Sequence, residues 1–550
     1  MEERTVKRRG FAPRILIIGA IMAGALLLRL PQLDFPSIGY HNMKENEYIS
    51  MAQHMLKTGD LIGRHVYFYN AFSENSDFNL YPQIPFVSYQ ILAGYKLFGD
   101  TLWFPRLINI LLMLAAFLCL YRIAGLLGLS LALRLAVLFL LAVMPLGVFF
   151  ARNLQAESGA FFAMCCGSVM GLHFIRSGKK IYLILFSLSL ALTAAYKIAF
   201  LIGFAAVFFL VPFRQYARSR RACGIAEDMA ILGIPLAVFI IYCYLTGQTS
   251  FSSTEGRVML WRPFTLAYWR QFGPIIRHYA INENFTFIYS VLAAAGMILA
   301  WVRIRTDRSM LAAYIRIWSV LIIPYIMVFN DYINQHNYYQ MPFLGLAVFA
   351  CVYCLESISR ASASFLRSIR QTHVFAIAFF TAFAVAVPGI FSAVRGHFGV
   401  IFPGADAVGI YLAKVMEPEE KFLIYTTSQG YAPCVYARKR CGWPDSLGQL
   451  KRIEAQEHIR YAVVYPFGFI RAMPPDMKEY IMGSYHVDSL GFVAAGDRVL
   501  PQAVVLKKGG TADIDAFIRD NIRNAKMDTV YRTLQGDIPF FMITAGRTDK

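Results

Sequence analysis

The hydrophobic positions of this chain fall into long uninterrupted runs, with short polar segments between them. The first run, residues 11–30, has the length of about 20 residues that a helix needs to cross the hydrocarbon layer of a membrane. Similar runs recur as far as residue 394. We therefore predict an all-α membrane domain with about eleven transmembrane helices, because a soluble protein would show shorter, alternating patterns.

The polar segments between these runs carry most of the positive charge. Of the 550 residues, 57% are hydrophobic and 16% are charged, and the formal net charge is +19. The Lys and Arg clusters fall on every second connection, as is typical of loops that face the cytoplasm. This pattern places the N-terminus in the cytoplasm and, with an odd number of spans, the C-terminal region outside. A continuous basic face is missing from the pattern, so nucleic acid is not expected as a partner.

Two segments break the run of spans. Residues 31–101 form a long exterior loop with helical periodicity at 45–57 and 85–98, which predicts two helices lying along the membrane interface. Residues 396–550 alternate short buried strands at 422–426 and 461–465 with helices at 445–457, 475–485 and 512–523. We interpret residues 1–395 as a membrane domain and 396–550 as a soluble α/β domain.

Cys434 and Cys441 lie close together in this second domain. The sequence leaves open whether the two cysteines form a disulfide or remain free thiols, because it does not give the distance and orientation of their side chains.

The first exterior loop concentrates charge at the membrane edge. His41, Lys44, Glu45 and Glu47 lie within seven residues, directly after the first span. Charges in such a position are costly unless they have a function. The structural alternatives are a carboxylate near the positive end of the following helix and a salt bridge between Lys44 and Glu47.

The order of these features resembles the GT-C superfamily of polyprenyl-phosphate-sugar glycosyltransferases, which includes protein O-mannosyltransferases and the lipid A aminoarabinose transferase. The resemblance covers roughly residues 1–394. It rests on the following motifs: Lys44-Glu45-Asn46-Glu47-Tyr48, Tyr81-Pro82-Gln83-Ile84-Pro85-Phe86, Arg152 with Glu157, Lys197, and His336-Asn337-Tyr338-Tyr339. One departure is that this chain has Lys44-Glu45 where many members have Asp-Glu.

The resemblance implies an inverting transfer of a hexose or pentose from a polyprenyl-phosphate donor to a lipid, glycan or protein. The expected location is the periplasmic face of a bacterial inner membrane. One carboxylate, either Glu45 or Glu47, would take the proton of the acceptor hydroxyl. Cations would hold the leaving phosphate as its charge grows. The candidates for that role are Lys44, Arg152, Lys197 and Arg257. The candidates for lining the substrate pocket are His41, Tyr81, Gln83, Glu157, His336, Tyr338 and Tyr339.

Structural interpretations stay open for several of these residues. Lys197 lies between two apolar runs, so its ammonium could simply extend to the interface. Arg152 and Glu157 could pair across the turn that they flank. Tyr338 and Tyr339 could be interface anchors.

No cofactor and no metal is expected. Relatives with monophosphate donors generally transfer without metal, and the DxD at Asp513-Ile514-Asp515 begins a predicted helix, where acids are favoured. The alternative function is a transporter or flippase for lipid-linked sugars. Such a protein would more often carry ionisable residues in the middle of its spans, and here the acids gather in exterior loops.

Overall fold

The computed structural model describes residues 11–63, 65–68, 72, 84–212, 216, 218, 222–245, 260–366, 370–427, 429–495 and 498–545. The chain divides into two compact units. The helical unit comprises Met1–Leu33, Tyr81–Phe86 and Arg106–Gly396, and the sheet unit comprises Asp34–Leu80, Val87–Pro105 and His397–Lys550. The predicted domain boundary at residue 395 stays a prediction. Three candidate residues, Tyr81, Gln83 and Arg257, lie outside the described residues.

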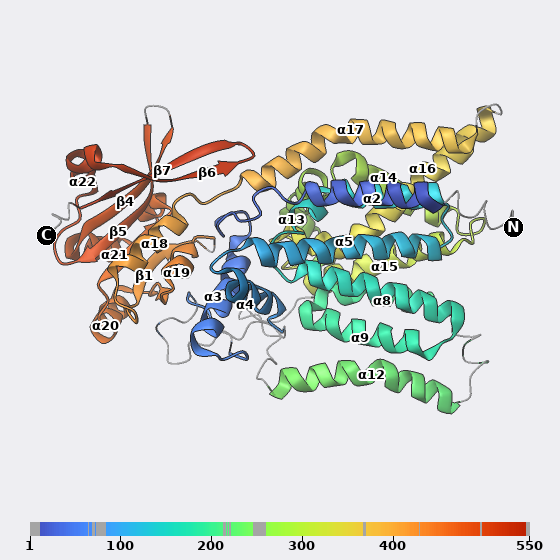
Figure 1. Ribbon diagram of the computed structural model, residues 1–550, viewed down its shortest axis with the longest axis horizontal. Coiled ribbons are helices and arrows are strands. Elements are labelled where there is room, and N and C mark those ends of the chain that lie inside the picture. Colours follow the sequence, from blue (N-terminus) through green and yellow to red (C-terminus); the bar gives the residue numbers. More distant parts are fainter. Residues whose placement is uncertain are drawn as a thin grey trace. The chain divides into compact units, whose positions relative to one another are not determined.

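The helical unit is built from apolar helices, several of which run alongside one another (Figure 1). They are α2 (Phe11–Leu27), α5 (Trp103–Leu126), α6 (Leu131–Val143), α7 (Pro145–Phe149), α8 (Glu157–Ser177), α9 (Lys180–Tyr196), α10 (Ile202–Phe208), α12 (Ala222–Leu245), α13 (Leu266–His278), α14 (Phe287–Val302), α15 (Met310–Phe329), α16 (Leu344–Leu366) and α17 (Gln371–Gly399). Shorter turns between them are η1 (Ile198–Leu201), η2 (Arg262–Phe264), η3 (Tyr279–Asn284) and η4 (Asn337–Phe343).

In the part of the chain that the structure describes, six helices are long and apolar enough to cross a membrane. The number is seven if Leu266–Asn284 and Phe287–Val302, which meet at 111°, count as one span. The protein is therefore a multi-pass membrane protein. Shorter apolar helices such as α2, α6, α9 and α10 fall below that length, so the predicted count of about eleven stays a prediction.

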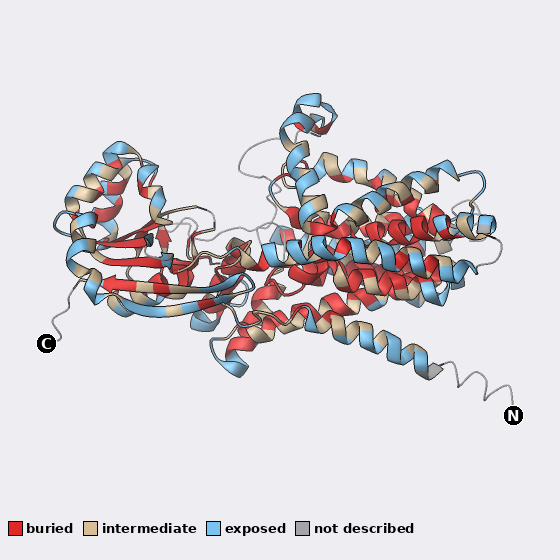
Figure 2. Ribbon diagram, turned by 90° about the horizontal axis from the view of Figure 1, so that it is seen from above, coloured by how far each residue is buried: buried red, intermediate tan, exposed pale blue. Residues whose placement is uncertain are grey.

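The outer helices expose apolar side chains, as expected for surfaces that contact lipid. In the most apolar stretch of each helix, only 17% is buried in α12 and in α17, against 72% in α8. Ile241 of α12 and Phe391 of α17 are more than half exposed. Figure 2 shows the same contrast between exposed outer faces and a buried interior.

A buried arginine satisfies the backbone where two helices break. Pro145 is the first residue of α7 and interrupts the path of α6. The Arg29 guanidinium donates to the carbonyls of Ala142 and Gly147, at 3.0 Å each, and lies 5.0 Å from the Phe117 ring centroid. In a membrane these carbonyls have no water to bind, so Arg29 holds the break together.

The sheet unit contains a mixed seven-stranded sheet in the order β2-β1-β3-β5-β4-β7-β6. Its helices are α3 (Asn42–Thr58), α4 (Phe86–Phe98), α18 (Ala405–Val415), α19 (Ala432–Ala437), α20 (Leu447–Glu457), α21 (Pro475–Ser484) and α22 (Ile514–Asn521), with the short turns η5 (Phe467–Arg471) and η6 (Ile522–Asn524). Its strands are β1 (Phe422–Thr426), β2 (Cys441–Gly442), β3 (Tyr461–Tyr465), β4 (Tyr485–Ala495), β5 (Arg498–Lys508), β6 (Lys526–Thr533) and β7 (Gly536–Thr544).

The predicted strands at 422–426 and 461–465 are confirmed as β1 and β3, which pair in parallel. The rest of the sheet was not predicted: β4 to β7 form two antiparallel hairpins. Irregular register in β4, next to Gly491, disturbs the alternation that would mark a strand in the sequence. The core of this unit includes Leu423, Val464 and Leu490, all fully or almost fully buried.

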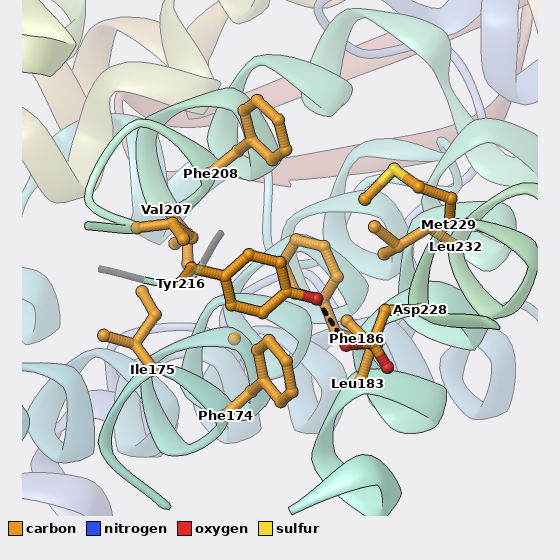
Figure 3. A pocket seen from close by; sticks show the side chains of 12 residues that line it. Phe174, Ile175, Leu183, Phe186, Val207, Phe208, Tyr216, Asp228, Met229 and Leu232 are labelled. Atoms are coloured by element: carbon orange, nitrogen blue, oxygen red, sulfur yellow. Dashed lines mark hydrogen bonds between the residues drawn. The ribbon is translucent and has the colours of Figure 1, made fainter. Parts of the chain in front are cut away.

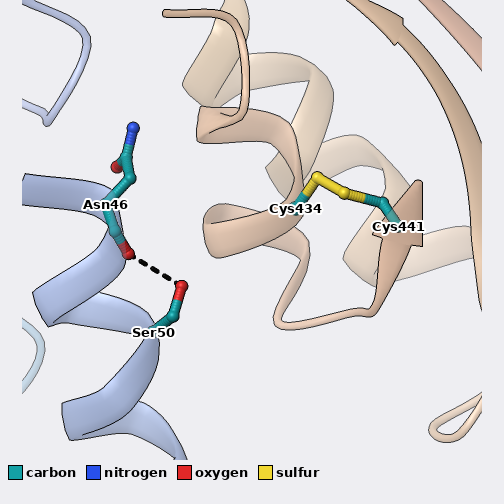
Figure 4. Close-up of a disulfide and its surroundings, with 4 residues drawn as sticks. All are labelled: Asn46, Ser50, Cys434 and Cys441. Atoms are coloured by element: carbon teal, nitrogen blue, oxygen red, sulfur yellow. Dashed lines mark hydrogen bonds between the residues drawn. A yellow bond between two sulfur atoms is a disulfide. The ribbon is translucent and has the colours of Figure 1, made fainter. Parts of the chain in front are cut away.

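The first exterior loop belongs to the same compact unit as the C-terminal sheet. Helix α3 packs against α19, and the Ser37 N–H donates to the Tyr436 hydroxyl at 2.7 Å. The Cys441 N–H donates to the Tyr67 carbonyl at 2.9 Å. Cys434 and Cys441 form a disulfide that links α19 to β2, close to α3 (Figure 4). Segments more than 300 residues apart in sequence therefore fold together.

Candidate active site

Helix α3 carries both candidate carboxylates in its first two turns. The helix starts at Asn42. The preceding residue, His41, has a left-handed backbone conformation with φ of 59°, so the chain changes direction there. Glu45 lies in the first turn, where the helix dipole favours a negative charge. The two glutamates are 5% and 1% exposed, so each needs polar partners.

The two carboxylates have different partners. The Ser37 hydroxyl donates to Glu45 Oε2 at 3.0 Å. Both oxygens of Glu47 accept from Lys44 Nζ, at 2.8 and 3.0 Å, which is the predicted salt bridge. Residues two apart in a helix point to different sides, so the carboxylates diverge. We call Ser37, Lys44, Glu45 and Glu47 the acidic cluster.

Two asparagines beside the acidic cluster were missed by the sequence analysis. Asn42 and Asn46 are fully buried, and the Asn46 amide donates to the Ser37 carbonyl at 3.3 Å. The Ser50 hydroxyl donates to the Asn46 carbonyl (Figure 4). The Asn42 side-chain amide makes no hydrogen bond within the described part of the chain. A buried amide of this kind is suited to bind a polar ligand group.

A second cluster forms around Lys197 in the helical unit. Helix α9 ends at Tyr196, and Lys197 follows with an extended backbone. Its ammonium is paired with Glu157, the first residue of α8, and the two side chains are 13% and 3% exposed. The same ammonium lies 4.3 Å from the Tyr338 ring centroid and 4.5 Å from that of Tyr339. The lysine is thus held by one carboxylate and two aromatic faces.

The aromatic side of this cluster comes from the segment around η4. His336 stacks on Tyr338 with ring centroids 5.0 Å apart. The Tyr325 hydroxyl donates to the Tyr339 carbonyl at 2.7 Å and fixes the turn. We call Glu157, Lys197, His336, Tyr338 and Tyr339 the lysine cluster. All five were candidates in the sequence, and the fold gathers them from three distant segments.

Polar residues of the π-helix η3 support the lysine cluster and were not predicted. The Asn337 side chain donates to Glu283 Oε2 at 2.5 Å. The Asn284 side chain donates to the Asn337 carbonyl and to Gln340 Oε1, at 2.9 Å each. The signal in the sequence was the polar group Asn282-Glu283-Asn284 directly before an apolar span. Single π-helical turns occur frequently at functional sites.

Arg152 lies in the helical unit and binds the chain just after α2. Its guanidinium donates to the Gln32 carbonyl at 2.5 Å. Gln32 has a positive φ of 55°, an uncommon conformation for a residue with a side chain. The acidic cluster and His41 belong to the sheet unit, whereas Arg152 and the lysine cluster belong to the helical unit.

Two cavities of the helical unit are apolar. One, of about 50 Å³, lies among α8, α9, α10 and α12, and Figure 3 shows Tyr216 donating to Asp228 at its side. It is too small for a sugar. The other, of about 860 Å³, is lined by α2, α6, α7 and α17, with residues such as Gly24, Phe139 and Phe391. Its lining suits a hydrocarbon chain.

The DxD motif has the structural role that was expected for it. The Asp513 side chain accepts the Ala516 N–H at 2.8 Å and caps α22.

Comparison with known proteins gives similarity in structure and not in sequence. No protein-family model matches the chain, and no curated protein sequence matches it significantly. ArnT from Cupriavidus metallidurans aligns with 89% of this chain and 97% of its own, with a TM-score of 0.51 and 13% identity. ArnT bound to undecaprenyl phosphate aligns over 90% and 97%, with a TM-score of 0.50 and 14% identity.

A second solved structure is similar to the same degree. It is the archaeal oligosaccharyltransferase AglB from Archaeoglobus fulgidus in complex with an inhibitory peptide and a dolichol-phosphate. It aligns with 89% of this chain and 74% of its own, with a TM-score of 0.53 and 12% identity. At such identities the likeness concerns the fold. The resemblance is confirmed at the level of the fold.

Proposed function

We propose that this protein is an integral membrane glycosyltransferase of the inverting type. It would move a hexose or pentose from a polyprenyl-phosphate donor to a lipid, glycan or protein on the periplasmic face. The supporting observation is a fold shared over about nine-tenths of the chain with ArnT, solved with undecaprenyl phosphate, and AglB, solved with a dolichol-phosphate. The acidic and lysine clusters supply the two kinds of group that this reaction requires.

Glu45 is the better candidate for the base. Both oxygens of Glu47 face the Lys44 ammonium, so an acceptor hydroxyl would first have to displace the lysine. Glu45 accepts a neutral hydroxyl from Ser37, which an acceptor hydroxyl can replace at little cost. In the reaction, Glu45 takes the acceptor proton while the oxygen attacks the anomeric carbon and the bond to the phosphate oxygen breaks.

Lys197 is the candidate for holding the leaving phosphate. Its side chain is 13% exposed, and on one side it meets tyrosine faces, which attract a cation more weakly than an anion does. A phosphate can therefore replace an aromatic contact with a stronger ionic one. As the bond to the sugar breaks, the phosphate gains charge, and a fixed ammonium stabilises it.

The polyprenyl tail needs an apolar surface. The cavity of about 860 Å³ lined by α2, α6, α7 and α17 offers one within the helical unit. The proposal assigns the base to the acidic cluster and the phosphate-holding cation to the lysine cluster.

The decisive experiment uses the full chain in lipid nanodiscs with a panel of synthetic undecaprenyl-phosphate hexoses and pentoses. Release of undecaprenyl phosphate is followed by mass spectrometry, with envelope extracts as the source of acceptor. Glu45→Gln is expected to lower the rate by about 10²- to 10⁴-fold, the usual contribution of a general base. Glu47→Gln removes a salt bridge and should have the smaller effect.

Glu479→Gln serves as the matched control, because that carboxylate is exposed on α21. Folding of each variant is checked by its elution as a monodisperse particle. Full transfer by both Glu45→Gln and Glu47→Gln would overturn the assignment of the base. In sealed proteoliposomes, movement of intact lipid-linked sugar across the bilayer without release would instead support a flippase.

A further inference from the structure

Three potential metal ligands meet at the end of α3, away from the acidic cluster. They are His54 in the last turn of the helix, Asp60 in the turn after it, and His65. One ligand atom from each lies within 4.8 Å of the other two. The imidazole rings have centroids 3.9 Å apart and planes inclined at 46°. All three residues belong to the sheet unit.

The backbone holds Asp60 in place for such a role. Helix α3 ends where Gly59 adopts a left-handed conformation, and the chain then turns sharply. Asp60 Oδ1 accepts the N–H groups of Gly63 and Ile62, at 2.9 and 3.0 Å. These two hydrogen bonds orient the carboxylate.

The glycine at position 63 leaves room for this arrangement. A Cβ atom there would lie 2.2 Å from Asp60 Oδ2 and 3.0 Å from His65 Cδ2. Any larger residue would therefore push the carboxylate and the second imidazole apart. The φ angle of Gly63 is not in the left-handed region, so space and not backbone strain accounts for the glycine.

We propose that His54, Asp60 and His65 form a site for a divalent transition metal, with Zn²⁺ the best fit. Two imidazole nitrogens and one carboxylate oxygen are a ligand set that Zn²⁺ accepts, with water or another small ligand in the remaining position. The donors favour Zn²⁺ over Mg²⁺ or Ca²⁺, which prefer oxygen ligands only. His54 and His65 are half-buried and Asp60 is exposed, so a metal can reach the site from solvent.

The site would connect the end of α3 to the loop that follows it. Glu45 and His54 lie nine residues apart in α3, about 13 Å along the helix axis, so this metal would not contact the proposed base. Its role would be to fix the C-terminal end of α3 to the segment around His65. The proposal stands independently of the glycosyltransferase proposal.

The test is metal binding by the full chain in nanodiscs, prepared without a polyhistidine tag and stripped with chelator. Titration with Co²⁺, read by its visible absorption, and then with Zn²⁺ in competition, should show one site per chain. His54→Ala, Asp60→Asn and His65→Ala should each abolish this site. Gly63→Ala keeps all three ligands and should weaken binding by about 10- to 100-fold, as changes beside metal ligands usually do.

His373→Ala is the matched control, because that histidine is exposed at the start of α17. It should bind one Co²⁺ as the unchanged chain does. Absence of stoichiometric binding in the unchanged chain would overturn the proposal, as would full binding by the double variant His54→Ala/His65→Ala. Monodisperse elution of each metal-free variant separates loss of the site from loss of the fold.

Discussion

The two units of the molecule each bury a glutamate against a lysine, and the surroundings of the two pairs differ. In the sheet unit, Glu454 accepts the Tyr480 hydroxyl at 2.6 Å, the Tyr485 hydroxyl, and Lys508 at 2.6 Å. In the helical unit, Glu157 is paired with Lys197, and the lysine turns its other side to tyrosine faces. The first pair is saturated by donors, whereas the lysine of the second pair also faces two aromatic rings.

This difference suggests how to separate a structural ion pair from a reactive one. The carboxylate of Glu454 has strong partners on both oxygens, and its burial is explained by stability alone. The two lysines differ in burial: the side chain of Lys197 is 13% exposed, whereas that of Lys508 is 40% exposed. Holding an ammonium inside a membrane unit is costly, and this cost points to a function. Four predictions follow from the comparison.

The largest effect is expected from Lys197→Ala. Without the ammonium, the leaving phosphate loses its stabilising charge, and transfer should fall by about 10²- to 10³-fold. Lys197→Arg keeps the charge and should retain part of the activity. Glu157→Gln keeps the cation and should do less harm than Lys197→Ala. Equal losses in Lys197→Ala and Glu157→Gln would mean that the pair is structural, as Glu454–Lys508 is.

The next largest effect concerns stability. Glu454→Ala leaves two tyrosine hydroxyls without their acceptor, and Tyr485 is fully buried. We expect a loss of about 3 kcal/mol in the free energy of unfolding of the sheet unit. Hydrogen exchange over α20 and β4 measures it. Glu454→Gln retains an acceptor and should lose less; transfer per folded molecule should be unchanged in both variants.

Another buried carboxylate, Asp406, makes the stability of the sheet unit depend on pH. It lies in α18 and accepts the Tyr531 hydroxyl, and burial raises its pKa to about 6. Because the pKa is raised in the folded state, the stability from this group is full below pH 4 and is lost as the pH rises through 6. The loss is about 2–3 kcal/mol. Protection factors in α18, which correct hydrogen exchange for its intrinsic rise with pH, should fall between pH 4 and 7, and Asp406→Asn should remove that fall.

The smallest effect is expected for an exposed pair. Lys57 and Glu419 are 2.8 Å apart, and their side chains are 65% and 83% exposed. Lys57→Ala should change the free energy of unfolding by less than about 1 kcal/mol, because solvent screens the interaction. Denaturant titration at low and high salt checks this. A large effect would show that α3 depends on this ion pair for its packing within the sheet unit.

Much of the candidate site could be predicted from the sequence, because several of its residues are charged or ionisable and lie between or beside apolar runs. Lys197 between two apolar runs, and four charged or ionisable residues next to the first span, are visible without any structure. Asn42, Glu283 and Asn284 were not identified: the polar group Asn282-Glu283-Asn284 is visible before an apolar span, but the sequence does not show which residues it contacts. Their burial and their partners arise only when distant segments fold together.

The His54, Asp60 and His65 group escaped detection for a similar reason. Its spacing matches no regular ligand motif, because a helix end and a tight turn bring the three residues together. The second half of the sheet was missed because two antiparallel hairpins carry register irregularities. The disulfide between Cys434 and Cys441 was left open because sequence does not give the distance between two cysteines.

By itself, the sequence determined that this is a membrane protein of many spans with a charged first loop and a soluble C-terminal region. These properties follow from local hydrophobicity, which any stretch of about 20 residues expresses alone. The tertiary structure decided which charges are paired: Glu47 with Lys44, Glu157 with Lys197, Glu454 with Lys508. It also joined the first loop to the last domain. Pairing and burial depend on contacts between segments far apart in the chain, and hydrophobicity along the chain carries no information about such contacts.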